Sequence, residues 1–514
     1  MGAPTLAHPF GSDVLGRDVL SRVIHGLRVS LAVSLAAVAI SLVLAVPLGL
    51  VAGYFGAWVD SAISRTLDMI LVLPAMLLAI TFIAILGPGS IVATLAIAVI
   101  YLPILARVMR TSTLVVTRHE FVAGARARGA SHLRVLLGHV APNALGPVIV
   151  QASILGAFAL QLEAGPQLSW LGAATDPVAG RHAGRRARRA DRRPLGRGFP
   201  RPCHRSGRSG LHAPGRRAAP RLRPEGGGGM TTLVSLADLS VSFGAQARPA
   251  VAGVTLSIDK GEIFGLVGES GSGKSTLAAA ILGLLPAHAR ISGSITLAGR
   301  EMIGLAEADL RRVRGNTAAM IVQDASASLD PTWPVGDQVA ETIRAHHPVS
   351  RAEARARATA LMVEVGIPDA ARRYRDPPHR FSGGMRQRIV IAAALANDPQ
   401  LLIADEPTTA LDVTIQAQVL ALIGALRRGH GTTVLLITHD LGVVGQVCDR
   451  VGVMHGGKLL ELAETRDLFH APQHPYTRAL LAANPVGAPR GSRLPVIPAE
   501  WSVESLRAAE QRHG

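Results

Sequence analysis

The chain has 514 residues, of which 48% are hydrophobic, 17% are charged and 4% are aromatic. Its net charge of +17 and mean hydropathy of +0.31 argue against an ordinary soluble protein and against a wholly disordered one. The two cysteines, Cys203 and Cys448, exclude a disulfide framework, and no Cys/His cluster has the spacing of a zinc site. At roughly 150 residues per domain, the length predicts two to four domains.

Three long stretches without a charged residue lie in the first third of the chain, at 29–59, 69–106 and 140–162. A membrane-spanning helix needs about 20 apolar residues, so the first and third stretches each predict one span. The second is too long for one helix, and Gly87-Pro88-Gly89 divides it into two. Buried core helices of a soluble domain are the alternative, but soluble cores rarely run 38 residues without a charge. We therefore expect an all-α transmembrane bundle of about four spans.

The charges beside these spans predict their orientation. No cleavable signal peptide is expected, because residues 1–28 carry five charged side chains and no short apolar segment before a cleavage site. Between Arg107 and His139 there are six arginines and a single acid, Glu120, which places this loop in the cytoplasm. Counting back, the turn at 87–89 faces outside, the loop Asp60–Arg65 faces inside and the N-terminal segment lies outside.

An arginine-rich segment follows the spans. Residues 181–223 contain fifteen arginines and one acid, and four glycines follow at 226–229. This composition cannot bury enough apolar surface to offset the entropy of ordering. Three interpretations stay open: a disordered linker, a patch for nucleic acid or anionic lipid, and GC-rich coding DNA translated out of frame. Phe199 is the single aromatic residue of the segment, which counts against single-strand binding, and Met230 is suited to begin an independent protein.

From Met230 onward the chain predicts an α/β domain. Short apolar or β-branched runs alternate with helical stretches, which is typical of a mainly parallel sheet covered by helices. The runs expected to form strands are 255–258, 263–267, 401–404 and 433–437.

The strongest chemical motif is a phosphate-binding loop. Residues 268–275 match G-x-x-x-x-G-K-[ST], between the expected strand 263–267 and an apolar helix at 276–285. Its glycines let backbone N–H groups surround phosphate oxygens at a helix N-terminus. Lys274 supplies a positive charge to the β- and γ-phosphates, and Ser275 offers its hydroxyl to Mg²⁺. The predicted ATP-binding residues are Gly268, Ser270, Gly271, Gly273, Lys274, Ser275 and Thr276.

A second motif, Leu401–Glu406, is an apolar run that ends in two acids. A strand tip beside a phosphate-binding loop is where a metal-associated carboxylate is needed. We expect Asp405 to hold Mg²⁺ and Glu406 to polarise the attacking water. A solvated turn is the alternative, which the neighbouring phosphate-binding loop disfavours.

Between these motifs, Phe381-Ser382-Gly383-Gly384-Met385-Arg386-Gln387 resembles the signature loop of the ATP-binding-cassette (ABC) family, and the resemblance covers about 231–485. It implies that two cassettes close on two ATP molecules, and that the signature residues complete the site of the opposite subunit. These residues are Ser382, Gly383, Gly384 and Gln387. The resemblance also implies roles for Gln323 (the Q-loop, touching Mg²⁺), Asp412 (the D-loop), His439 (the γ-phosphate switch) and Phe243 (adenine stacking).

Three further stretches resemble the dipeptide/oligopeptide/nickel importers within that family: 323–331, 403–414 and His474–Leu481. Members often carry a cysteine-containing tail after the last motif, whereas no cysteine follows it here. Residues 8–13 and 16–22 resemble the start of the inner-membrane permease of the same importers. The stretch Glu120–Asn143 resembles the cytoplasmic coupling loop of such permeases, through Glu120, Ala123, Gly129, His139, Pro142 and Asn143. An ordinary amphipathic connecting helix is the alternative for this stretch.

The resemblance implies a permease–ATPase fusion of a peptide or nickel importer, multi-pass in the plasma (inner) membrane with its ATPase domain in the cytoplasm. We expect an incomplete permease at 1–165, since such permeases usually have about six spans, a linker at 166–229, an ATPase domain with a helical subdomain at 230–485 and a tail at 486–514. ATP and Mg²⁺ are the implied cofactors.

The implied partners are a second ATPase subunit, a second permease subunit, an extracytoplasmic substrate-binding protein and membrane lipid, but no nucleic acid. Two alternatives stay open. In one, only the ATPase functions and the permease fragment is vestigial, from a damaged gene fusion. In the other, a nucleic-acid-associated ATPase uses the arginine-rich segment, which the spans and the coupling loop argue against.

Overall fold

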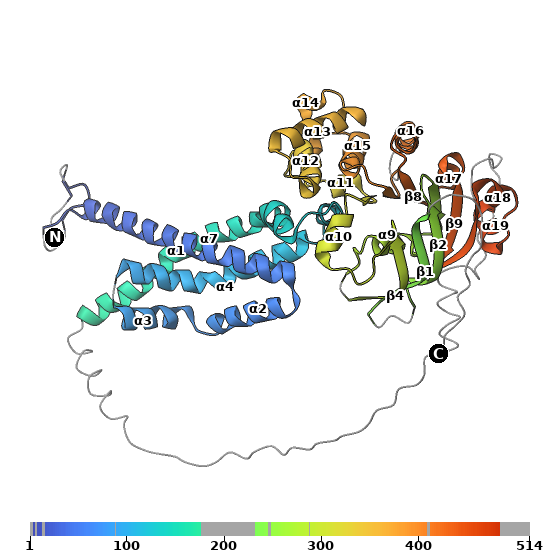
Figure 1. Cartoon of the computed structure of the whole chain (residues 1–514). Coiled ribbons are helices and arrows are strands. Elements are labelled where there is room, and N and C mark those ends of the chain that lie inside the picture. Colours follow the sequence, from blue (N-terminus) through green and yellow to red (C-terminus); the bar gives the residue numbers. More distant parts are fainter. Residues whose placement is uncertain are drawn as a thin grey trace, which may run out of the picture. The chain divides into compact units, whose positions relative to one another are not determined.

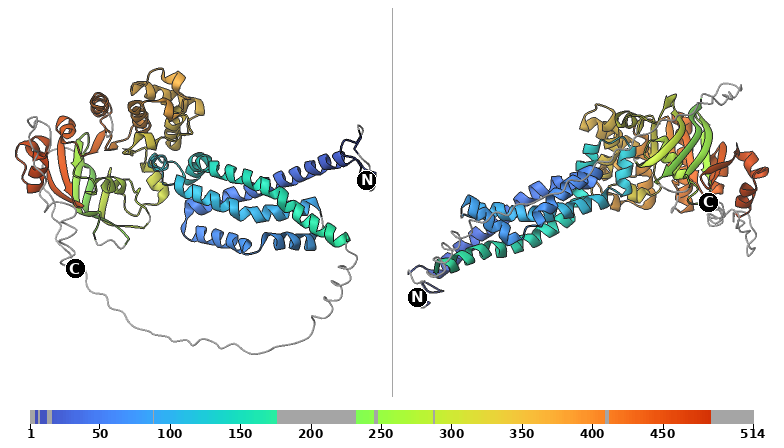
Figure 2. Two further views of the ribbon diagram at one scale, coloured as in Figure 1. Left: turned by 180° about the vertical axis from the view of Figure 1, so that it is seen from behind. Right: turned by 90° about the horizontal axis from the view of Figure 1, so that it is seen from below.

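The computed structural model describes residues 4–5, 8–12, 16–87, 89–175, 232–244, 248–286, 288–408 and 412–483, without the side chains of 162–175, 325–326, 426 and 430. The expectations for the arginine-rich segment, Met230 and the tail 486–514 lie outside these residues. The described chain is drawn in Figure 1, with two further views in Figure 2.

The chain divides into two compact units, each built from separate stretches. Of the described residues, one unit contains those within 4–43, 67–103 and 152–175, and the other contains those within 44–66, 104–151 and 232–483. The second unit therefore holds the C-terminal domain (described residues 232–483) together with the predicted coupling stretch.

The helices of the N-terminal third are long and apolar. They are α1 (Val19–Phe55), α2 (Ala57–Leu71), α3 (Ala75–Leu86), α4 (Ser90–Val116) and α7 (Ala141–Thr175). Three helical stretches, 19–55, 90–116 and 132–161, are long and apolar enough to cross a membrane, or up to four if the pair α2–α3, bent by 81°, is one span. Within the first unit, the Ser41 hydroxyl donates to the Ala98 carbonyl and the Ser34 hydroxyl to the Gly156 carbonyl, both at 2.8 Å. The predicted helical transmembrane region is confirmed.

The expected loop at Asp60–Arg65 is wrong, because these residues lie within α2. Asp60 is in the first turn of this helix, where a carboxylate is favoured by the helix dipole. It accepts from Ser64 one turn later and pairs with Arg110 of α4. The helical structure is interrupted after α2, between Leu71 and Ala75, where Pro74 precedes α3.

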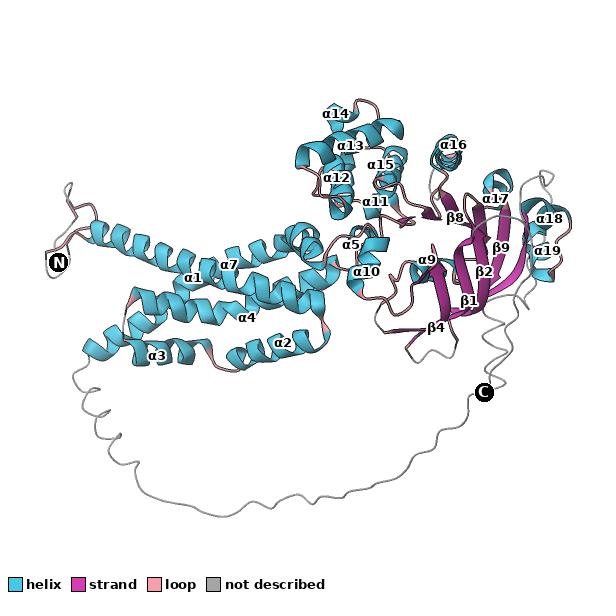
Figure 3. Ribbon diagram, viewed as in Figure 1, coloured by secondary structure: helices cyan, strands magenta, loops and turns pink. Residues whose placement is uncertain are grey.

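The C-terminal domain contains two sheets (Figure 3). The six-stranded sheet has the order β10-β9-β3-β8-β7-β6, and only β10 is antiparallel to its neighbour. Its strands are β3 (Ile263–Val267), β6 (Ala318–Ile321), β7 (Leu401–Asp405), β8 (Thr433–Thr438), β9 (Arg450–His455) and β10 (Lys458–Glu464). Every residue of β3, β7 and β8 is buried, as expected for parallel strands covered on both faces. The predicted α/β fold is confirmed.

The second, four-stranded sheet is antiparallel and has the order β2-β1-β4-β5. Its strands are β1 (Thr232–Phe243), β2 (Val251–Asp259), β4 (Ala289–Leu297) and β5 (Arg300–Glu301). One hydrophobic cluster joins β1, β2 and β4 to β3 and to α9 (Lys274–Ile281). The helix expected at 276–285 ends early, because Gly283 has φ +61° and the Arg314 guanidinium binds the carbonyls of Leu282 and Gly283 at 2.8 and 2.5 Å.

The remaining helices of this domain are α10 (Glu307–Val313), α11 (Ala325–Ser328), α12 (Val335–His346), α13 (Arg351–Glu364), α14 (Ala370–Arg373), η2 (Pro378–Arg380), α15 (Gly383–Leu395), α16 (Val413–His430), α17 (Leu441–Val447), α18 (Thr465–His470) and α19 (Pro475–Ala482). A second hydrophobic cluster joins α12, α13, α15 and α16 to one face of the parallel sheet. A third packs α17, α18 and Tyr476 against β9. The phosphate-binding loop thus follows the carboxyl end of β3, an inner strand of a sheet that hydrophobic clusters cover on both faces.

Candidate functional site

The predicted phosphate-binding loop lies between β3 and α9, as its motif requires. At Gly268 (φ +153°) a Cβ atom would lie 2.1 Å from the Met454 carbonyl oxygen, and at Gly273 (φ +101°) 2.3 Å from that of Ala250. Only glycine fits these two positions, because the obstacles are backbone atoms and the conformations disfavour other side chains. Ser270 and Gly271 are exposed at the tip of the loop.

Lys274, the first residue of α9, is buried and turns back over the loop. Its Nζ donates to the carbonyls of Gly268 and Glu269 at 2.8 Å and to the Ser272 hydroxyl at 3.2 Å. Burial lowers the pKa of Lys274, against the attraction of Glu406 and Asp405. A partly desolvated ammonium within a loop of backbone N–H groups is well suited to bind a polyanion.

Asp405, the last residue of β7, lies next to Ser275. Burial raises the pKa of Asp405, while a hydrogen bond from the Ser275 hydroxyl lowers it. Among the described residues its buried Oδ1 has no hydrogen-bond partner. An unsatisfied carboxylate oxygen beside a hydroxyl fits the oxygen ligands that Mg²⁺ prefers. The two residues therefore suit the metal expected here.

Glu406 lies where three distant segments meet. Its Oε2 accepts from Gln323 Nε2 at 3.0 Å, and its Oε1 is 3.3 Å from His439 Nδ1. The backbone N–H of Glu406 donates to the Ile437 carbonyl in β8 at 2.8 Å. The φ angle of Glu406 is +49°, in the left-handed region. The side chain is thereby held at the edge of the sheet beside the phosphate-binding loop.

The signature residues lie elsewhere in the domain. Ser382 caps α15, where its hydroxyl accepts from the Met385 N–H at 3.4 Å, and Gly383 begins that helix. Gly384 packs so closely on Ile415 of α16 that a Cβ would lie 2.7 Å away. Asp412 caps α16. Gln387 is buried, and no described contact joins any of these residues to the phosphate-binding loop.

Two predicted nucleotide residues are more peripheral. Phe243 ends β1, half-buried, with its ring centroid 6.1 Å from that of His288. Thr276 lies in the first turn of α9. Neither makes a described contact with Glu406, Gln323 or His439.

The coupling segment, residues 120–143, packs on the C-terminal domain within the second unit. It comprises α5 (Glu120–Ala127), α6 (His132–Arg134), the π-helical turn η1 (Val135–Val140) and the start of α7, and α5 contacts α11 and β6 (Figure 3). Partial burial and the charges of Asp324 and Asp405 raise the pKa of Glu120, against a hydrogen bond from the Asp324 backbone. Ala123 and Pro142 are exposed.

Gly129 and Gly315 allow the backbone of the coupling segment to approach the backbone of the C-terminal domain closely. A Cβ at Gly129 (φ +85°) would lie 2.7 Å from the Arg314 carbonyl oxygen, and one at Gly315 (φ +77°) 2.6 Å from that of Arg128. The Arg311 side chain donates to the Gly129 carbonyl at 3.2 Å, and His346 Nε2 lies 3.1 Å from the Arg128 carbonyl oxygen. The segment therefore docks through its backbone, which explains the glycine that the sequence singled out.

A buried charged cluster completes this contact. His139 Nδ1 is 2.8 Å from Asp330 Oδ2, and its Nε2 is 2.9 Å from Glu341 Oε2. Asn143 Nδ2 donates to the His139 carbonyl at 2.8 Å and to Asp330 Oδ1 at 3.2 Å. Burial lowers the pKa of Arg128, while the charges of Glu341 and Asp330 raise it. Sequence reasoning gave no role to Arg128 or Glu341. Asp330 lies in the stretch 323–331 that resembles the peptide importers, but the residues around it in the sequence do not indicate that it binds His139.

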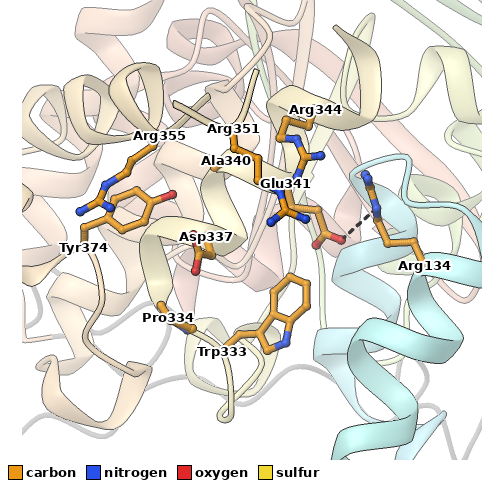
Figure 4. Close-up of a pocket in the computed structure, with 10 residues that line it drawn as sticks. All are labelled: Arg134, Trp333, Pro334, Asp337, Ala340, Glu341, Arg344, Arg351, Arg355 and Tyr374. Atoms are coloured by element: carbon orange, nitrogen blue, oxygen red, sulfur yellow. Dashed lines mark ion pairs between the residues drawn. The ribbon is translucent and has the colours of Figure 1, made fainter. Parts of the chain in front are cut away.

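A pocket of about 390 Å³ lies beside this cluster rather than at the phosphate-binding loop (Figure 4). Arg134 of the coupling segment forms one wall, with its Nε 3.7 Å from Glu341 Oε1. The rest of the lining comes from α12, α13 and their neighbours: Trp333, Pro334, Asp337, Ala340, Glu341, Arg344, Arg351, Arg355 and Tyr374.

Comparison with known proteins agrees with both parts of the site. The ABC transporter family profile matches residues 251–409. The profile of the binding-protein-dependent transport system inner membrane component matches 45–175, and that of the oligopeptide/dipeptide transporter C-terminal region matches 460–508.

Among curated proteins, the probable peptide ABC transporter ATP-binding protein y4tR of Sinorhizobium fredii is 50% identical over 280 residues, 54% of this chain and 83% of that protein. The dipeptide transport ATP-binding protein DppD of Bacillus subtilis is 48% identical over 260 residues, 50% of this chain and 78% of that protein. The oligopeptide transport ATP-binding protein OppD of Mycobacterium bovis is 48% identical over 273 residues, 52% of this chain. The chain spans 45% of the length of this mycobacterial relative.

Proposed function

The chain belongs to the ABC transporter family of peptide-transport ATP-binding proteins and carries a binding-protein-dependent permease region, and from this premise we propose that it hydrolyses ATP to drive import of a small peptide. The observation that carries the proposal is the meeting of Gln323, His439 and Glu406 at the sheet edge that bears the phosphate-binding loop.

In this proposal each residue has a defined task. Lys274 and the loop N–H groups bind the β- and γ-phosphates. Glu406 accepts the proton of the attacking water, and its hydrogen bonds with Gln323 and His439 fix the direction of its carboxylate. Asp405, Ser275 and Gln323 would hold Mg²⁺, which neutralises charge that develops on the phosphates. Phe243 stacks on the adenine.

A second cassette supplies the rest of the site. Ser382, Gly383, Gly384 and Gln387 complete the ATP site of that partner, next to Asp412 at the start of α16. This division of labour explains why the signature and the phosphate-binding loop make no described contact within one chain.

Cassette closure then reaches the membrane through the coupling segment. The contacts of Gly129, Asn143 and the charged cluster support this route, since they bind the segment to the domain that carries the ATP site. We propose a plasma-membrane location with the cassette in the cytoplasm, a second permease subunit and an extracytoplasmic binding protein. Nickel remains the alternative cargo, and ATP hydrolysis with a vestigial permease region the alternative function.

The test is ATP hydrolysis and peptide uptake by the full chain, reconstituted with its partner subunits. Glu406→Gln keeps the shape and removes the base, so hydrolysis should fall about 10²- to 10⁴-fold while ATP still binds. Lys274→Ala should lose binding itself. Glu353→Gln, an exposed glutamate in α13 paired with Arg357, is the matched control. Undiminished hydrolysis in Glu406→Gln would refute the site, and hydrolysis without uptake would favour the vestigial permease.

A further inference from the structure

The most completely enclosed ionisable group in the coupling segment is His139. Its side chain has 0% exposure, and each ring nitrogen faces a carboxylate of the C-terminal domain. These partners, Asp330 and Glu341, lie 191 and 202 residues away in the chain. The Trp333 ring covers the imidazole, with the ring centroids 4.6 Å apart.

The hydrogen-bonding pattern identifies the protonation state. A neutral imidazole has one donor and one acceptor, whereas an ionised carboxylate only accepts. Burial raises the pKa of Asp330, but hydrogen bonds from His139, Thr332 and Asn143 outweigh it and the pKa is lowered, so this carboxylate is ionised. An ionised carboxylate on each side of the ring requires both ring nitrogens to donate, which only the imidazolium form does.

Four charged side chains surround His139, from all the elements that pack against it. Arg128 directly follows α5, Arg134 lies in α6, Asp330 follows α11 and Glu341 lies in α12. Arg128 is itself only 8% exposed, so these charges are largely removed from solvent. Without the second ring proton of His139, one of the two carboxylates would face the lone pair of a ring nitrogen, and a buried carboxylate without its donor is strongly unfavourable.

We propose that His139, as an imidazolium bound by Asp330 and Glu341, is the positioning residue that fixes the coupling segment on the cassette, and that docking takes up a proton there. The role of this docking in transport rests on the proposed function, whereas the docking itself does not. Because the docked state binds this proton and the undocked segment exchanges it with water, docking is favoured at low pH and weakens as pH rises.

The test follows docking directly, through hydrogen-exchange protection of the amides of 120–143 in the full chain in membrane discs. In the unsubstituted protein, protection corrected for intrinsic exchange should fall at least tenfold as pH rises from about 6 to about 9. His139→Gln should lose about a hundredfold or more at the lower pH. His119→Gln, at an exposed histidine immediately before the segment, is the matched control.

A charge-balanced variant separates the ion pair from simple packing. His139→Gln combined with Glu341→Gln removes one cation and one anion, so it should recover part of the lost protection and show no dependence on pH in this range. Protection of His139→Gln equal to that of the unsubstituted protein, or no recovery in the double variant, would overturn the proposal. If these variants do not fold, the pH series of the unsubstituted protein decides alone, and a flat series rejects the inference. Since the readout is docking, it is decided whether or not the chain hydrolyses ATP.

Discussion

Replacing Gly129 by alanine perturbs the coupling contact at one atom. The new Cβ would lie 2.7 Å from the Arg314 carbonyl oxygen and 2.5 Å from His346 Nε2, and φ would stay at +85° only under strain. A left-handed backbone disfavours a side chain by about 1–2 kcal/mol. The clash with the Arg314 carbonyl remains even in that conformation, and relieving it by moving the segment away also loses the Arg311 and His346 contacts with the Gly129 and Arg128 carbonyls, each about 0.5–1.5 kcal/mol.

Together these terms weaken docking by about 2–5 kcal/mol, or about 30-fold to 5,000-fold. We expect that loss in the hydrogen-exchange protection of the coupling segment, and fewer peptides imported per ATP hydrolysed by the reconstituted transporter. Gly146→Ala is the control, since nothing lies within 4 Å of a Cβ there and alanine favours the helix. Equal protection and equal coupling in Gly129→Ala and Gly146→Ala would refute the backbone-docking argument.

Two further predictions concern residues that support the two sites. Gly315→Ala should uncouple transport as Gly129→Ala does, because its Cβ would meet the Arg128 carbonyl oxygen at 2.6 Å; normal uptake per ATP would contradict this. Tyr476, fully buried, has its pKa raised by burial to about 12 and hydrogen-bonds the backbone of Glu269 in the phosphate-binding loop. Tyr476→Phe should therefore weaken ATP binding severalfold, at about 1 kcal/mol for the lost bond, with little change in the melting temperature; titration with a fluorescent ATP analogue measures this, and unchanged affinity would contradict it.

The phosphate-binding loop and the acids beside it could be located from the sequence because each lies within a short contiguous motif. Residues 268–275 and 401–406 carry both the strand that precedes the site and the side chains that form it. Family resemblance implied separate roles for Gln323 and His439, but their contacts with Glu406, 83 and 33 positions away in the chain, were not predicted.

The expected strand 255–258 lies within β2, but the other strands of the four-stranded sheet and the charged cluster were missed, for physical reasons. β1 carries several irregularities of register against β2 and β4, so its apolar residues do not alternate cleanly. The partners of His139 are fixed by folding over about 200 residues rather than by local pattern. An isolated histidine gives no sign of which carboxylates will enclose it.

Glu406 keeps a backbone conformation that residues with a side chain rarely adopt, with φ at +49°. Strain of this kind amounts to about 1–3 kcal/mol, and glycine or asparagine would relieve much of it. A sequence selected only for thermal resistance would therefore abandon glutamate at this position. Glutamate at this position thus lowers the stability of the fold while it presents a carboxylate beside the phosphate-binding loop.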